Sequence, residues 1–99
     1  MAGPLDLSAI EAQLSEASEF MRMWSRDGGA MCIIEPQNLG ADPAMFGIAM
    51  ADAIRHGAKA WARAVNVSED HALERIMQGF NAEMKSPTDK PIDMNDKIN

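Results

Sequence analysis

The sequence has one cysteine, few basic residues and no long apolar run, and each shortage excludes a class of function. Cys32 has no second cysteine for an internal disulfide bond, and no cysteine and histidine cluster has the spacing of a zinc site. The longest uncharged apolar stretch, residues 43–51, is far shorter than the roughly 20 residues of a membrane-spanning helix. Nine basic against fifteen acidic residues give a net charge of −6, which repels nucleic-acid phosphates. We expect a reducing compartment and no metal, membrane or nucleic-acid partner.

Motifs of common catalytic and nucleotide-binding sites are also missing. The sequence has no phosphate-binding loop, no dinucleotide-binding glycine fingerprint, no His-Glu-x-x-His motif and no serine elbow. Its first residues have neither the basic start nor the continuous apolar stretch of a secretion signal. We therefore expect a cytoplasmic protein with no cofactor. The sequence favours a non-enzymatic role and assigns no catalytic residue.

Residues 20–35 carry the most informative pattern, two short apolar-rich runs joined by Asp27-Gly28. An Asp-Gly pair accepts the positive φ angles of a type I′ turn, so the pattern predicts an antiparallel hairpin with a two-residue loop. This loop sets the register of the strands and divides the side chains between two faces. The predicted core face carries Met21/Ile34, Met23/Cys32 and Ser25/Ala30, and the second face carries Phe20/Glu35, Arg22/Ile33 and Trp24/Met31.

The second face of the hairpin is too apolar to be left in water. A two-stranded ribbon is also marginally stable alone, and its outer edge presents unpaired backbone groups. Either the N-terminal helix or another copy of the chain can cover this face, and a second copy can also pair with the edge. We therefore expect a homodimer that forms through the ribbon edge or the second face, with Phe20, Trp24, Met31 and Ile33 as its contact residues.

The segment before the hairpin has the pattern of a helix. Ser8 and Glu11 have the spacing of a capping box, which predicts that a helix begins at Ser8. Met21 and Trp24 continue the helical spacing of the apolar residues in this segment. A single helix over residues 8–26, in an all-α protein, is therefore the alternative to the hairpin.

Two long helices are predicted after the hairpin. Asp42-Pro43 is a start signal for a helix that runs to about Val65, and Asn66 can adopt the left-handed conformation that ends it. Ser68 caps the next helix, which extends to about residue 85. Apolar residues recur along one side of each helix and predict burial there. These residues are Phe46, Met50, Ala53, Ile54, Gly57 and Trp61, then Leu73, Ile76, Met77, Phe80 and Met84.

Two features complete the predicted organisation. Gly47 and Gly57 lie inside the first long helix, where glycine is unfavourable, which predicts close approach of a neighbouring backbone. Residues 87–99 combine proline, charge and amides without periodicity, which predicts a mobile tail. We expect one α+β domain over residues 1–86, with the order helix, hairpin, helix, helix.

One group of residues offers a candidate ligand site. Asp52 and His56 are four apart on the first long helix, so they can project from one face as a carboxylate and imidazole couple. Arg55 beside them can hold an anion. An anionic-ligand binding protein or an enzyme that uses these three residues is therefore the second hypothesis for function.

A combination of motifs resembles a known family. Arg22-x-Trp24-x-x-Asp27-Gly-Gly is followed by a helix that opens at Asp42-Pro43 and contains Asp52-x-x-Arg55-His56. This arrangement is similar to a small bacterial family of uncharacterised proteins, a domain of unknown function. The resemblance implies a ribbon followed by two helices and implies no mechanism. The first hypothesis for function is thus a self-associating protein-interaction module with an unknown protein partner.

Overall fold

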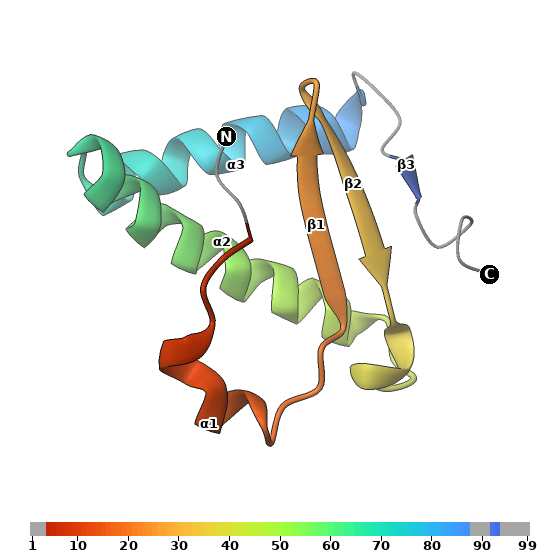
Figure 1. The fold of residues 1–99 in the computed structure, drawn as a ribbon. Helices are drawn as coiled ribbons and strands as arrows, with labels where there is room; N and C mark the ends of the chain where they lie inside the picture. The colour runs from red at the N-terminus through yellow and green to blue at the C-terminus, as the bar shows by residue number, and fades with distance from the viewer. Residues whose placement is uncertain (1–3, 88–91, 94–99) are drawn as a thin grey trace.

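The computed structural model describes residues 4–87 and 92–93, and it confirms the α+β class (Figure 1). A short N-terminal helical turn leads into an antiparallel hairpin, and two long helices follow. A very short third strand lies near the C-terminus. The elements are η1 (Ser8–Ile10), α1 (Glu11–Leu14), β1 (Met21–Arg26), β2 (Gly29–Ile34), η2 (Pro36–Asn38), α2 (Ala44–Val65), α3 (Glu69–Lys85) and β3 (Ile92–Asp93).

The N-terminal helix is shorter than predicted. Helical structure begins at Ser8, but the Ser8 hydroxyl caps nothing, and instead the Asp6 Oδ1 atom accepts the Ser8 backbone N–H at 3.0 Å. The predicted capping box is therefore wrong. α1 ends at Leu14, and the apolar side chains of this segment stay 42–49% exposed. Residues 21–26 form the strand β1, so the alternative of a single helix over residues 8–26 is wrong.

The hairpin has the predicted turn and register. Asp27 and Gly28 have φ angles of 52° and 79°, as a type I′ turn requires. Arg26 lies opposite Gly29, and the pairing continues without a bulge to Met21 opposite Ile34. The Asn38 side chain donates to the Glu19 carbonyl at 2.5 Å and ties η2 to the start of the ribbon.

A third strand, which the sequence analysis did not include, completes the sheet. β3 runs parallel to β2 on the side away from β1, so the strand order is β1-β2-β3. Most of the predicted tail over residues 87–99 lies outside the described residues. β2 is half-buried along its whole length, whereas β1 is exposed from Arg22 to Arg26. In the described part of the chain, the outer side of β1 is thus the free edge of the sheet.

The two long helices begin and end close to the predicted residues. The Asp42 Oδ1 atom accepts the Ala44 N–H at 3.0 Å, as predicted for a capping side chain, and α2 begins at Ala44, one residue after the predicted start at Pro43. Asn66 ends α2 with a φ of 55°, and the Ser68 hydroxyl accepts the His71 N–H at 3.0 Å at the start of α3. Local backbone chemistry therefore decides these boundaries, as expected.

α2 and α3 pack along a line of small residues. Ala58 and Ala72, at 1% and 5% exposure, are the buried hydrophobic residues of the described chain. A Cβ atom at Gly57 would lie 3.8 Å from the Ile76 Cδ1 atom, an ordinary contact with a side chain. At Gly47 a Cβ atom would meet nothing within 4 Å. The predicted close approach of a backbone at these two glycines is therefore wrong.

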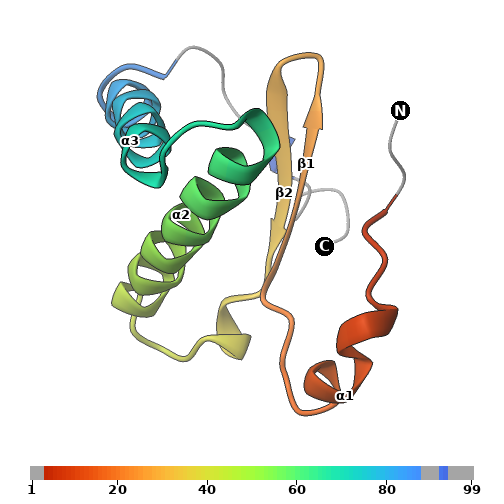
Figure 2. The same cartoon turned by 90° about the vertical axis from the view of Figure 1, so that its left-hand side faces the viewer.

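The ribbon and the helix pair form two layers whose backbones do not approach closely. Figure 2 shows the helix pair on one side of the ribbon and the N-terminal turn on the other. The chain has a Cα radius of gyration of 15.2 Å, against about 13 Å for a compact domain of this length. Its accessible surface is 8629 Å², against about 5,500 Å² for a folded monomer of this mass. Exposed apolar side chains occur on both layers, among them Met23, Trp24, Phe80 and Met84.

Candidate interaction surface

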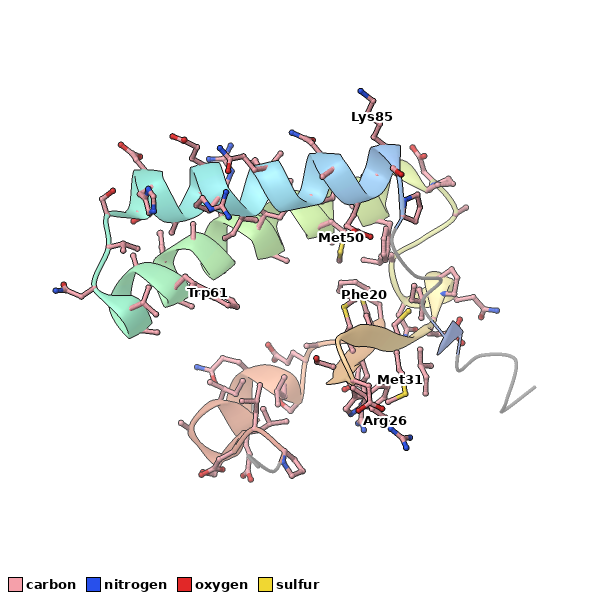
Figure 3. The ribbon with its side chains drawn as sticks, turned by 90° about the horizontal axis from the view of Figure 1, so that it is seen from above. Phe20, Arg26, Met31, Met50, Trp61 and Lys85 are labelled. Carbon is pink, nitrogen blue, oxygen red and sulfur yellow. The ribbon has the colours of Figure 1, made fainter. Side chains whose placement is uncertain are left out.

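The second face of the ribbon points away from the helices. Figure 3 shows Arg26 and Met31 on the side of the ribbon opposite α2, whereas Met50 of α2 points toward the ribbon. Trp24, opposite Met31 in the hairpin, is 42% exposed. The N-terminal turn makes no extensive contact with this face, so it does not cover the face. An aromatic ring and its neighbours are left in contact with water, which is unfavourable.

Three of the four predicted contact residues meet in one hollow. Phe20, Trp24 and Ile33 line a shallow pocket of about 430 Å³ on the ribbon. Met31 lies opposite Trp24 in the register, whereas Figure 3 shows Phe20 on the side of the ribbon that faces α2. Phe20, Met31 and Ile33 are half-buried. We call the region of Trp24, Met31 and Ile33 the ribbon face.

Charged groups border the ribbon face, and each has a partner within the chain. The Glu19 Oε1 atom lies 2.7 Å from Arg22 Nε, and both side chains are well exposed. The Glu35 carboxylate accepts the Gln37 N–H at 3.2 Å at the start of η2. An exposed ion pair contributes at most about 1 kcal/mol to folding, so the Arg22 pair mainly orients the guanidinium. It holds that group beside the aromatic residues of the ribbon face.

The free edge of β1 presents backbone groups at alternate residues. The Glu35 N–H donates to the Phe20 carbonyl at 2.7 Å, so these two residues form a hydrogen-bonded pair. In an antiparallel ladder such pairs recur at every second residue, which directs the backbone of Arg22, Trp24 and Arg26 toward β2. The N–H and C=O groups of Met21, Met23 and Ser25 therefore point outward. We call these groups the β1 edge.

An apolar groove of about 580 Å³ runs between α2 and α3. Phe80 and Met84 in its wall are 42% and 71% exposed. The sequence analysis predicted that these side chains lie in a core, and the structure leaves them in an open groove. The methionine content of the sequence was the signal that could have indicated an exposed groove, because methionine is common on adaptable binding surfaces. The groove is lined by Phe46, Gly47, Met50, Ala51, Ile54, Arg55, Leu73, Met77, Phe80 and Met84.

The structure does not form the predicted couple between Asp52 and His56. Both side chains are exposed on α2, and no hydrogen bond joins them in the part of the chain that the structure describes. Arg55 lines the apolar groove between α2 and α3, and neither Asp52 nor His56 is among the residues of that groove. The three residues therefore remain a predicted ligand site without a shared cavity.

The described residues give little support to a reactive thiol, a metal site or a membrane-spanning helix. Cys32 is half-buried and lies opposite Met23 in the hairpin. Residues 4–87 and 92–93 contain no group of three or more acidic, histidine or cysteine side chains placed to hold a metal ion. None of the helices in this same part of the chain has the length and apolar content needed to cross a bilayer. The apolar surfaces are thus the main candidates for function.

Comparison with known proteins identifies the family. The sequence profile named Domain of unknown function (DUF5076) matches residues 7–88, which include the hairpin and both long helices. The chain belongs to the DUF5076 family. This confirms the predicted resemblance to a domain of unknown function with a ribbon and two helices. Membership of DUF5076 assigns no activity.

A solved structure from the photosynthetic bacterium Rhodopseudomonas palustrus is similar to this DUF5076 chain over nearly its full length. That protein, provisionally named a pyruvate dehydrogenase, is 34% identical, and the match covers 91% of this chain and 93% of the other with a TM-score of 0.66. No curated protein matches the DUF5076 chain. The comparisons therefore establish the fold and the family and leave the biochemical role open.

Proposed function

We propose that this DUF5076 chain is a self-associating protein-interaction module that works as a homodimer. The observation that carries the proposal is the small core: among the described hydrophobic residues only two alanines are buried. Folding a chain costs about 1–2 kcal/mol of backbone entropy per residue, which apolar burial must offset. A second copy that covers the open faces supplies the missing burial.

The size of the uncovered surface fits this role. The accessible area of the chain, 8629 Å², exceeds the expectation for a folded monomer by about 3,000 Å². Obligate homodimers bury about 2,000–5,000 Å² in total, or about 1,000–2,500 Å² from each chain. The excess area is large enough for an obligate interface, and exposed apolar side chains of the described residues contribute to it. The ribbon face is the part of this surface with an exposed aromatic anchor, Trp24.

The cellular setting follows from the charge and the thiol. A single half-buried cysteine suits the reducing cytoplasm, where the dimer would be held without a disulfide bond. The net charge of −6 favours protein partners over nucleic acid. The proposal assigns no catalysis to the chain.

Sedimentation equilibrium tests the proposal, with two tryptophans as a matched pair. Trp24 lies on the ribbon face, whereas Figure 3 places Trp61 on α2, and Trp61 is 62% exposed. We expect a dimer at micromolar concentration and a weaker dimer for Trp24→Ala, by about 2 kcal/mol or about 30-fold in Kd. Trp61→Ala should leave the Kd nearly unchanged. A purely monomeric chain at tens of micromolar would refute self-association, and equal effects of the two variants would refute the ribbon face.

A second candidate function rests on Arg55 in the wall of the apolar groove. One guanidinium beside methionine, leucine and phenylalanine side chains fits a ligand with an anionic head and an apolar body. A thermal-shift assay with long-chain carboxylates tests it, since bound ligand raises the melting temperature with its concentration. Arg55→Gln should abolish the shift and Lys59→Gln should preserve it. The absence of any shift would exclude this candidate and leave the groove as a protein contact.

A further inference from the structure

We infer that the second copy docks along the β1 edge as an antiparallel strand, with Met23 opposite the partner's Met23. This inference rests on the proposed self-association and adds the pairing and its register. It joins two sheets into one continuous sheet around a two-fold axis between the two Met23 residues. The ribbon faces of both copies then lie side by side on the same surface of that sheet.

The β1 edge is the longer open edge of the described sheet, because β1 has six residues and the opposite edge strand, β3, has two. β3 lies against the other side, along Met31 and Cys32 of β2. β1 is exposed from Arg22 to Arg26, so no described segment covers its outer side. Antiparallel pairing of β1 with its own copy is two-fold symmetric and uses the same edge of both chains, so it forms a closed dimer. The topology therefore favours a second copy as the occupant.

Backbone geometry limits the possible registers. The outward groups belong to Met21, Met23 and Ser25, and an antiparallel partner must align its own outward groups with them. With Met23 at the two-fold axis, Met21 lies opposite the partner's Ser25. Five residues of each strand then overlap, and all outward groups of the β1 edge find partners.

Charge decides between this register and its neighbours. If Met23 lay opposite the partner's Ser25, Arg22 would lie opposite the partner's Arg26. If Met23 lay opposite the partner's Met21, Arg22 would face the partner's Arg22. Like charges placed directly opposite one another destabilise a sheet. The register with Met23 at the axis avoids both arrangements.

The same register places Arg22 opposite the partner's Trp24. These residues form a pair without direct backbone bonds, in which the Cα atoms are about 4.5 Å apart and the side chains are closest. A guanidinium over an indole ring is a favourable cation–π arrangement. Glu19 already holds the Arg22 guanidinium at 2.7 Å, which reduces the freedom lost on docking. Symmetry provides this pair twice, and it covers the exposed Trp24 ring.

Cysteine cross-linking tests the register. The background carries Cys32→Ala, because Cys32 lies opposite Met23 within one chain and would capture a thiol there. The variants are Met23→Cys, Met21→Cys and Ser25→Cys. Opposite residues of a hydrogen-bonded pair have Cα atoms about 5.5 Å apart, within the range of a disulfide bond. Mild oxidation followed by non-reducing electrophoresis gives the linked fraction.

We expect the Met23→Cys variant by itself to form a disulfide-linked dimer. Its linking rate should be about 100-fold higher than that of thiols that meet by random collision, because the dimer holds the two thiols in one complex. A mixture of the Met21→Cys and Ser25→Cys variants, refolded together, should form linked dimers. Either variant by itself should not. Sedimentation of the reduced variants provides the control for assembly. Dimers that do not link through Met23→Cys would overturn the register and leave self-association intact. Monomers of the unmodified chain would instead overturn the proposed function, and this inference with it.

Discussion

Gly57→Ala measures how closely α2 and α3 approach each other. The sequence pattern predicted that a backbone lies against Gly57, in which case a methyl group would collide with it. The structure places the nearest heavy atom, Ile76 Cδ1, at 3.8 Å from an added Cβ. This is ordinary van der Waals contact, so the added methyl group fits without movement.

The expected size of the change follows from helix propensity. Alanine is more favourable than glycine inside a helix by about 0.8–1 kcal/mol, and contact with Ile76 adds a small further gain. A gain of 1 kcal/mol raises the melting temperature of a domain of this size by about 4–8 °C. We therefore expect Gly57→Ala to increase the melting temperature by several degrees. Thermal unfolding followed by circular dichroism, at one fixed protein concentration, measures the change.

Gly79→Ala is the matched control. Gly79 lies in α3, and a Cβ atom there would meet nothing within 4 Å. It carries the same gain in helix propensity without any contact between the helices. The two variants should raise the melting temperature by similar amounts. If Gly57→Ala lowered it while Gly79→Ala raised it, the helices would be closer than the structure places them, and the reasoning would be refuted.

Three further changes test the local structure. Gly28→Ala introduces a side chain at a φ of 79° in the hairpin turn, so urea unfolding should show a loss of about 1–2 kcal/mol; no loss would contradict the type I′ turn. Ser68→Ala removes the acceptor for the His71 N–H and should cost about 1 kcal/mol in the same assay, whereas Ser68→Asp keeps the cap. The Ser8 backbone N–H, as donor, lowers the pKa of the Asp6 carboxyl. The hydrogen bond from Ser8 to the Asp6 carboxylate therefore stabilises the N-terminal turn above about pH 4, and this stabilisation is lost as the pH falls through the lowered pKa of Asp6. An NMR titration with an ordinary midpoint for Asp6 would contradict this.

The arrangement of two thin layers gives the interaction hypothesis its physical basis. A ribbon and a helix pair each have an apolar side, and a single chain of this size leaves much of both exposed. Under the proposed function, the methionines of the α2–α3 groove and Trp24 of the ribbon face would contact another chain rather than form a core. Association through the β1 edge and burial of the two layers are compatible, because they use different surfaces of the chain.

Much of the fold and part of the candidate surface could be predicted from the sequence. Asp27-Gly28 set the turn and hence the register, which brought Trp24 opposite Met31. Asn66 and Ser68 marked the junction of the long helices to the residue. These features depend on φ angles and hydrogen bonds within a few residues, so the local sequence contains the information they need.

Only the tertiary structure decided which apolar side chains are covered. The spacing of Phe80 and Met84 predicted a buried stripe, yet both line an open groove and are 42% and 71% exposed. The N-terminal helix ends at Leu14 with its apolar side chains exposed, and β3, from far along the chain, pairs with Met31 and Cys32 of β2. Periodicity shows which side of an element is apolar, but burial depends on what packs against that side, and this is set by segments distant in sequence or by another chain.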